Sequence, residues 1–194
     1  MGPCAASSSG DPHMVNMFGE KFDVLKRGMH VLIQIPQGAD PQHTLLRVEA
    51  NVTGGKLCNY TFIKNLNITG QWTKEHRPGW PVARPDGFQY AALSHGQRAP
   101  QEQYDGKLVT HKSHLNFGEV KLMIAYGKMV DSGLTYLNFR VKNLHNVTEP
   151  VGGLLGLDDY KDVSSSATCT PDPEYADMSH AEQLEAGDVT MGAV

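Results

Sequence analysis

Apolar and polar side chains alternate along several short segments of the chain. These segments are residues 14–18, 21–25, 30–35, 45–52, 57–63, 66–72, 120–126 and 136–141. Successive side chains of a strand point to opposite faces, so a period of two predicts strands that bury one face. Turn residues separate the segments at 19–20, 54–55, 64–65 and 127–133. The pattern predicts an all-β domain, either an antiparallel β-sandwich or a barrel-like sheet.

The alternation stops between Thr73 and Gly106, where prolines, glycines and aromatic residues follow no period. A segment of this length without regular structure is usually either functional or disordered. We therefore expect a long irregular loop over residues 73–106, either ordered and able to dock a partner or a flexible excursion. Its candidate partner contacts are Trp80, Phe88 and Tyr90.

The two ends differ in composition from the segment between them. Residues 1–9 are small and polar, which predicts a linker. Residues 10–162 form the predicted β-domain, and residues 163–194 form a tail that either docks against another subunit or is solvated. Within the tail, the Ser-His-Ala-Glu sequence at 179–182 predicts a capped short helix that ends at Gly187.

Size and charge limit the classes of function. At 194 residues and 21.2 kDa, one domain can bury a sufficient core without metal ions or disulfides. A net charge of -4 and a pI near 6.1 provide no basic field for nucleic acid, so we expect no nucleic-acid partner. No segment approaches the ~20 apolar residues of a membrane span. The first ten residues lack the features of a signal peptide, so any such peptide has been removed or belongs to a longer precursor.

Four of the nine asparagines stand in Asn-x-Thr sequences, namely Asn51, Asn59, Asn67 and Asn146. With 21 serines and threonines in the chain, chance predicts about one such sequence. The excess favours N-glycosylation and a secretory route, to the outside of the cell or to the lumen of an organelle. The alternative is that threonine is common because it favours strands.

The three cysteines show no Cys-x-x-Cys or Cys/His zinc spacing. One disulfide and one free thiol is the simplest arrangement in a secreted protein. We favour a bond between Cys58 and Cys169, which would attach the tail to the domain. A bond between Cys4 and Cys169, or three unpaired thiols in a reducing compartment, are the alternatives.

The sequence contains no nucleophile elbow, Walker loop, dinucleotide fingerprint or zinc-protease motif, so we expect no enzyme in the usual sense and no cofactor. The bond between Asp11 and Pro12 is the chemically distinctive feature. The Asp11 carboxylate can attack its own carbonyl carbon, with the proline nitrogen as leaving group and His13 as a nearby acid. The alternative is that Asp11 and His13 only hydrogen-bond the first strand to the end of the domain.

Two motifs at the ends of the β-domain carry a family resemblance. The first is Gly-Asp-Pro-His at 10–13, followed by apolar residues, a glycine turn at Gly19 and Phe-Asp at 22–23. The second is Gly-Leu-Leu-Gly at 153–156, followed by acidic residues. Together they resemble the von Willebrand factor type D domain. The cysteine-poor form is similar to the C-terminal domain of inter-alpha-trypsin inhibitor heavy chains, to the related part of repulsive guidance molecules, and to protist domains with this motif.

The resemblance implies a β-framework in which residues 14–18 lie beside residues 154–157. It also implies self-cleavage between Asp11 and Pro12, as in several related domains. The family's calcium site is only partly matched, because Phe18 and Leu157 stand at ligand positions and leave Asp158, Asp159 and Asp162 as candidates for a weak site. The usual cysteines beside the two motifs are also replaced.

Two functions follow as expectations. The first is a non-catalytic, extracytoplasmic structural or interaction module whose partners are other proteins of a larger assembly. The second is a self-processing module that cleaves between Asp11 and Pro12.

Overall fold

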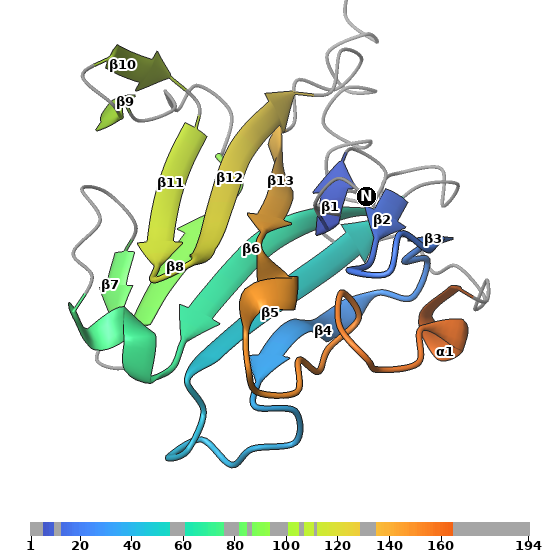
Figure 1. Cartoon of the computed structure of the whole chain (residues 1–194). Helices are drawn as coiled ribbons and strands as arrows, with labels where there is room; N and C mark the ends of the chain where they lie inside the picture. The colour runs from blue at the N-terminus through green and yellow to red at the C-terminus, as the bar shows by residue number, and fades with distance from the viewer. Residues whose placement is uncertain are drawn as a thin grey trace, which may run out of the picture.

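The computed structural model describes residues 6–9, 13–54, 61–75, 82–84, 87–93, 101–104, 107–110, 112–128 and 135–164. Thirteen strands lie in these ranges (Figure 1). They are β1 (Ala6–Ser9), β2 (His13–Val15), β3 (Lys21–Asp23), β4 (Gly28–Ile35), β5 (Leu46–Gly54), β6 (Thr61–Thr69), β7 (Val82–Arg84), β8 (Gly87–Ala91), β9 (Gln101–Tyr104), β10 (Lys107–Thr110), β11 (Lys112–Phe117), β12 (Val120–Lys128) and β13 (Thr135–Lys142). The helical turns are η1 (Gln71–Glu75), η2 (Leu144–Asn146) and α1 (Lys161–Ser164).

Eleven strands are hydrogen bonded into one branched antiparallel sheet, and β9 pairs with β10 in a second, two-stranded sheet. The branched sheet consists of two rows that cross one another (Figure 1). The β13 row is β3-β2-β1-β13-β12-β11, and the β6 row is β4-β5-β6-β8-β7. The rows meet where Leu137 of β13 pairs with Ile63 of β6. The prediction of an antiparallel, sandwich-like β-fold is confirmed, and the sheet does not close into a barrel.

The core lies between the two rows and follows the predicted period of two. In β5, Leu46, Val48 and Ala50 are fully buried, whereas the alternate residues Arg47 and Glu49 are half-buried on the other face. The same alternation places three side chains of β12 and three of β13 in this core, namely Val120, Leu122, Ile124, Leu137, Phe139 and Val141. One continuous apolar cluster therefore joins both rows.

The predicted turn at Lys64 and Asn65 is wrong, because both residues lie inside β6. Asn51 of β5 pairs with Asn65, while the next residue, Val52, pairs with Ile63, so Lys64 is an extra residue in β6. An extra residue in one strand is a β-bulge, which interrupts the alternation without ending the strand. Two successive polar residues therefore indicated a turn where the strand continues.

The predicted irregular loop at 73–106 is not irregular throughout. It contains β7, β8 and β9, and β8 pairs with β6 from Asn65 to Thr69. Phe88 and Tyr90 lie in the core with exposed fractions of 6% and 0%, so neither is available as a partner contact. The sequence did not predict strand β8 because its alternation, Phe88-Gln89-Tyr90, spans only three residues and lies among prolines and glycines. Trp80, the third predicted contact, lies outside the described residues.

The N-terminal prediction also needs correction. Residues 6–9 are not linker but strand β1, which pairs with β13 on one side and β2 on the other. A strand of one alanine and three serines has no alternating hydrophobic pattern by which the sequence could have predicted it. At the other end, α1 is a single turn, and the predicted helix at 179–187 lies outside the described residues.

A buried hydrogen bond joins the two rows near their edge. The Tyr90 hydroxyl of β8 lies 3.0 Å from Ser113 Oγ of β11, and both side chains are fully buried. We predict that Tyr90→Phe and Ser113→Ala each lower the free energy of unfolding by about 1–3 kcal/mol, because each removes this hydrogen bond from a fully buried hydroxyl group. The double variant should lose less than the sum of the single losses, as urea denaturation would show. Additive losses would mean that the two hydroxyl groups are not coupled.

Candidate functional site

The glycine-rich segment at residues 152–156, here called the closing segment, lies along the edge of β4. Gln34 and Gly152 exchange two backbone hydrogen bonds of 3.0 and 2.8 Å. Leu155 N donates to Leu32 O at 2.9 Å, and Met17 N of the β2–β3 turn donates to Leu155 O at 2.9 Å. The predicted adjacency of residues 14–18 and 154–157 is therefore confirmed.

Two glycines allow this close approach. Gly153 has a φ of 87°, and a Cβ added to it would lie 2.5 Å from Leu32 O. A Cβ added to Gly156 would collide with the carbonyl oxygen of Val151. Glycine is required at both positions for space, and at Gly153 also for its left-handed backbone.

The β2–β3 turn that meets the closing segment is organised by Asn16. This side chain is only 2% exposed, and its Oδ1 accepts hydrogen bonds of 3.0 Å from the backbone N–H groups of Phe18 and Glu20. Its Nδ2 donates to Glu20 Oε2 at 2.7 Å. Sequence analysis missed Asn16, although asparagine just before a Phe-Gly turn is a recognised signal for such side-chain capping.

The candidate calcium ligands have structural partners instead. Asp158 Oδ2 accepts a hydrogen bond from Gly153 N, and its Oδ1 accepts one from Gln37 Nε2, both of 2.7 Å. Asp159 Oδ1 accepts a hydrogen bond from the backbone of Lys161 at 2.9 Å. Within the described ranges, no three His, Cys, Asp or Glu side chains form a group that could hold a metal ion, so Asp158, Asp159 and Asp162 are not gathered as a ligand set.

The candidate cleavage site is only partly visible. Asp11 and Pro12 lie outside the described residues. His13 begins β2 opposite Asp23 of β3, and its Nδ1 contacts Asp23 Oδ1 in an exposed pair. The imidazole next to the candidate bond is thus oriented by a carboxylate.

The predicted glycosylation and disulfide residues are dispersed. Asn146 is exposed in η2, whereas Asn51 and Asn67 are half-buried on the outer face of β5 and β6. The Oδ1 atom of Asn67 is buried without a hydrogen-bond partner. Asn59 and the two cysteines of the favoured disulfide, Cys58 and Cys169, lie outside the described residues, as does Cys4.

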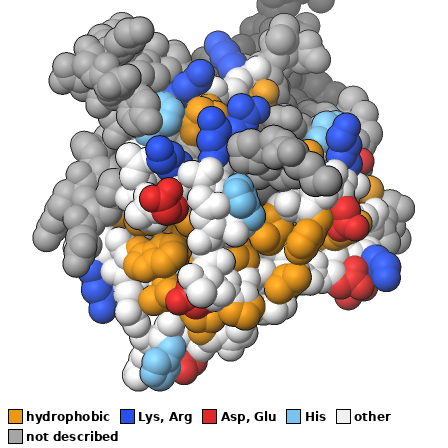
Figure 2. Space-filling view, in the orientation of Figure 1, with side chains coloured by type: hydrophobic (Ala, Val, Ile, Leu, Met, Phe, Trp, Pro, Cys, Tyr) orange, Lys and Arg blue, Asp and Glu red, His pale blue; other side chains and the backbone are white. Residues whose placement is uncertain are grey.

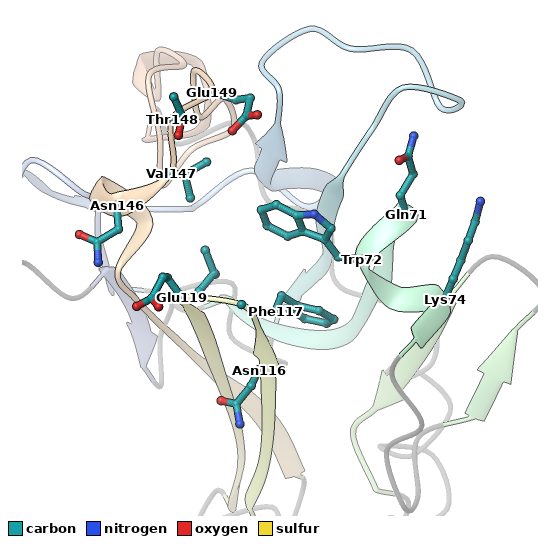
Figure 3. Close-up of a pocket in the computed structure, with 12 residues that line it drawn as sticks. Gln71, Trp72, Lys74, Asn116, Phe117, Glu119, Asn146, Val147, Thr148 and Glu149 are labelled. Carbon is teal, nitrogen blue, oxygen red and sulfur yellow. The ribbon is translucent and has the colours of Figure 1, made fainter.

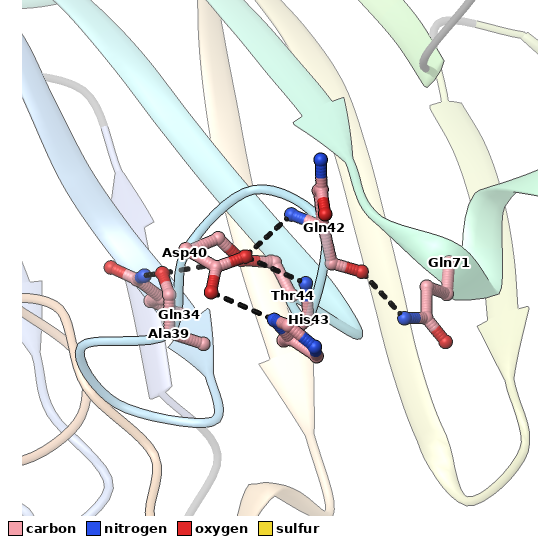
Figure 4. A network of polar contacts seen from close by, with 7 residues as sticks. All are labelled: Gln34, Ala39, Asp40, Gln42, His43, Thr44 and Gln71. Atoms are coloured by element: carbon pink, nitrogen blue, oxygen red, sulfur yellow. Dashed lines mark hydrogen bonds and ion pairs between the residues drawn. The ribbon is translucent and has the colours of Figure 1, made fainter.

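A polar network in the loop between β4 and β5 fixes the position of η1 (Figure 4). Asp40 Oδ1 accepts hydrogen bonds from the backbone N–H groups of Gln42 and His43, and Asp40 Oδ2 lies 2.7 Å from His43 Nδ1. The His43 side chain lowers the pKa of the Asp40 carboxyl below its ordinary value, helped by these backbone bonds. Gln71 Nε2 then donates to Gln42 O at 2.8 Å, which links the loop to η1.

An open groove of about 790 Å³ lies between η1, the β11–β12 turn and the segment after η2 (Figure 3). It is lined by Gln71, Trp72, Lys74, Asn116, Phe117, Gly118, Glu119, Val120, Asn146, Val147, Thr148 and Glu149. The face of the molecule seen in Figure 2 exposes hydrophobic side chains with acidic side chains beside them. Sequence analysis missed this groove and treated Trp72 as the end of a strand.

Comparison with known proteins adds no identification. No protein-family model matches the chain, and no curated protein matches it. In the part of the chain that the structure describes, no helix has the length and apolar character needed to cross a membrane.

The close approach at Gly153 can be tested against Gly38, which has a similar φ of 71° but open space where a Cβ would lie. We predict that Gly38→Ala costs about 1–2 kcal/mol for its left-handed backbone alone. Gly153→Ala should cost clearly more, and Gly153→Val or Gly156→Val should destabilise strongly. Thermal and urea unfolding would measure the differences. Equal losses for Gly38→Ala and Gly153→Ala would contradict the close packing against β4.

Calcium dependence is a separate test of the closing segment. Because Asp158 already accepts two hydrogen bonds from the protein, we predict that EDTA hardly changes the melting temperature. Addition of calcium should also have little effect, since Ca²⁺ prefers six to eight oxygen ligands. A large loss with EDTA that calcium restores would show that other oxygens complete a site.

Proposed function

We propose that this chain is a non-catalytic, extracytoplasmic module that serves as a structural or interaction unit of a larger extracellular or lumenal assembly. The observation that carries the proposal is that the residues in and beside the two end motifs form structural contacts with each other. Met17 N donates to Leu155 O, Asn16 caps the β2–β3 turn, and Asp158 caps the closing segment. The polar residues beside these motifs thus serve to hold the ends of the domain together.

The proposed location rests on the sequons. Asn146 is exposed in a short helical turn, where an attached glycan would meet no paired strand. Asn51 and Asn67 lie on paired strands and are half-buried, so a glycan on either would have to leave from the face of the sheet. We therefore expect Asn146 to be glycosylated more completely than Asn51 or Asn67. The partners we propose are other proteins.

Purification of the protein from its native source tests both parts of the proposal. Its intact mass tests the secretory location, and the proteins that co-purify with it test its role as an interaction module. We predict a mass raised by at least one glycan, removed by glycosidase, with Asn146 converted to Asp in the released peptide. Gentle purification should recover the chain with partner proteins. An unmodified mass together with a purified monomer free of partners would contradict the proposal.

A self-processing module is the second candidate, favoured by one contact. Asp23 orients the His13 imidazole immediately after the candidate bond. In the proposed reaction the Asp11 carboxylate oxygen attacks the Asp11 carbonyl carbon, the bond to the Pro12 nitrogen breaks, and that nitrogen takes up a proton. Water then opens the resulting cyclic anhydride and restores two carboxyl groups.

Acid lability separates self-processing from ordinary aspartyl-proline hydrolysis. We predict that the bond between Asp11 and Pro12 is intact at neutral pH and is cleaved first at mildly acidic pH. The bond between Asp172 and Pro173 is the internal control, because it has the same chemistry without the Gly-Asp-Pro-His motif. Intact-mass analysis should show cleavage after Asp11 that Asp11→Asn abolishes and Asp23→Asn slows. Equal cleavage at both bonds, or cleavage only after Asp172, would exclude self-processing.

A further inference from the structure

The groove has a fixed aromatic wall. The backbone N–H groups of Gln71 and Trp72 donate to Thr44 O and Leu45 O, each at 3.0 Å, so η1 is attached to the residues just before β5. Trp72 is half-buried and packs against the core, and its ring points across the groove toward Val147 (Figure 3). Phe117 of β11 lies below it. The indole is therefore held in place before any ligand arrives.

Two unpaired carboxylates border this aromatic wall. Glu119 lies in the β11–β12 turn, whose backbone is held by a 2.9 Å hydrogen bond from Asn143 Nδ2 to Glu119 O. Glu149 follows η2, and the adjacent Pro150 O accepts a hydrogen bond from Gln37 N at 2.8 Å. Both side chains are exposed, and neither carboxylate forms a hydrogen bond or ion pair within the part of the chain that the structure describes. Among the described lining residues Lys74 is the one base, so these residues together carry one excess negative charge.

We propose that this groove binds an extended basic segment of a partner protein, with an arginine or lysine side chain over Trp72. A cation is attracted to the face of an indole, and arginine also forms paired hydrogen bonds with a carboxylate. Glu119 and Glu149 supply those carboxylates, and the amide group of the lining residue Asn116 suits a peptide backbone. The volume lies in the range of ligand sites, about 300–1,000 Å³.

Charge complementarity selects this occupant over others. An acidic peptide or a phosphate would meet two carboxylates and only one lysine. A neutral saccharide could stack on Trp72, but it would leave both carboxylates without a counter-charge. The proposal rests on the proposed function, since it names the chemistry of the partner that the interaction module would bind.

Peptide binding by the intact chain tests the proposal directly. The probe is a fluorescein-labelled Arg-Ser-Arg-Ser-Arg peptide, compared with the same peptide carrying Gln in place of Arg, and with a trimer of N-acetylglucosamine as competitor. Fluorescence anisotropy at low salt should give an affinity at least about tenfold higher for the arginine peptide, and the trimer should not displace it. Equal affinity for both peptides, or displacement by the trimer, would overturn the proposal.

Matched variants locate the binding. Glu119→Gln with Glu149→Gln should weaken arginine-peptide binding at least about tenfold, whereas Asp159→Asn with Asp162→Asn changes the net charge equally and should weaken it less than about twofold. Trp72→Leu should also weaken binding, with the melting temperature measured to confirm folding. Equal effects of the two charge pairs would refute the groove as the site. If the protein is glycosylated and co-purifies with partners but fails these peptide-binding tests, the proposed function stands. Only the proposed binding of a basic segment in the groove is then refuted.

Discussion

The backbone pairing of the closing segment with β4 is the constraint on which the rest of the structure depends. β4 pairs with β5 along one edge, and residues 152–155 satisfy backbone groups along its other edge. The same segment accepts the hydrogen bond from Met17, so the β13 row, through β2 and β3, is attached to the edge of the β6 row. This arrangement has no room for a side chain at Gly153 or Gly156, so the pairing requires glycine at both positions.

The closing segment also determines the shape of the surface. Because Gln37 and Gln34 hold residues 150 and 152, the chain just before them must pass along the end of the sandwich. There it forms one wall of the groove, and η1, held by the β4–β5 loop, forms the opposite wall. Walls that are fixed before binding reduce the ordering cost of association. The proposed binding of a basic segment therefore depends on the same backbone bonds as the stability of the fold.

Polar residues beside the end motifs have structural partners that account for them. Asn16 and Asp158 each cap a turn, and His13 contacts Asp23 across two paired strands. Among the described residues, carboxylates without a hydrogen bond or ion pair occur instead at Glu119, far from both motifs in the sequence, and at Glu149, four residues before the second motif. The candidate interaction surface is thus separate from the residues that carry the family resemblance.

The sequence alone determined the antiparallel β-class and the strands with long alternation such as β5, β12 and β13, and the resemblance carried by the two end motifs implied that they are adjacent. Alternation is a local property of the chain, so it is visible in the sequence before any strand pairing is known. The glycines of the closing segment are visible as well, since they are required wherever that segment packs closely. Only the tertiary structure decided that Ala6–Ser9 is a strand, that Lys64 forms a bulge and that Phe88 and Tyr90 belong to the core. Each of these depends on pairing with a distant strand. The groove could not be predicted at all, because three loops far apart in the sequence form it only after the two rows have packed together.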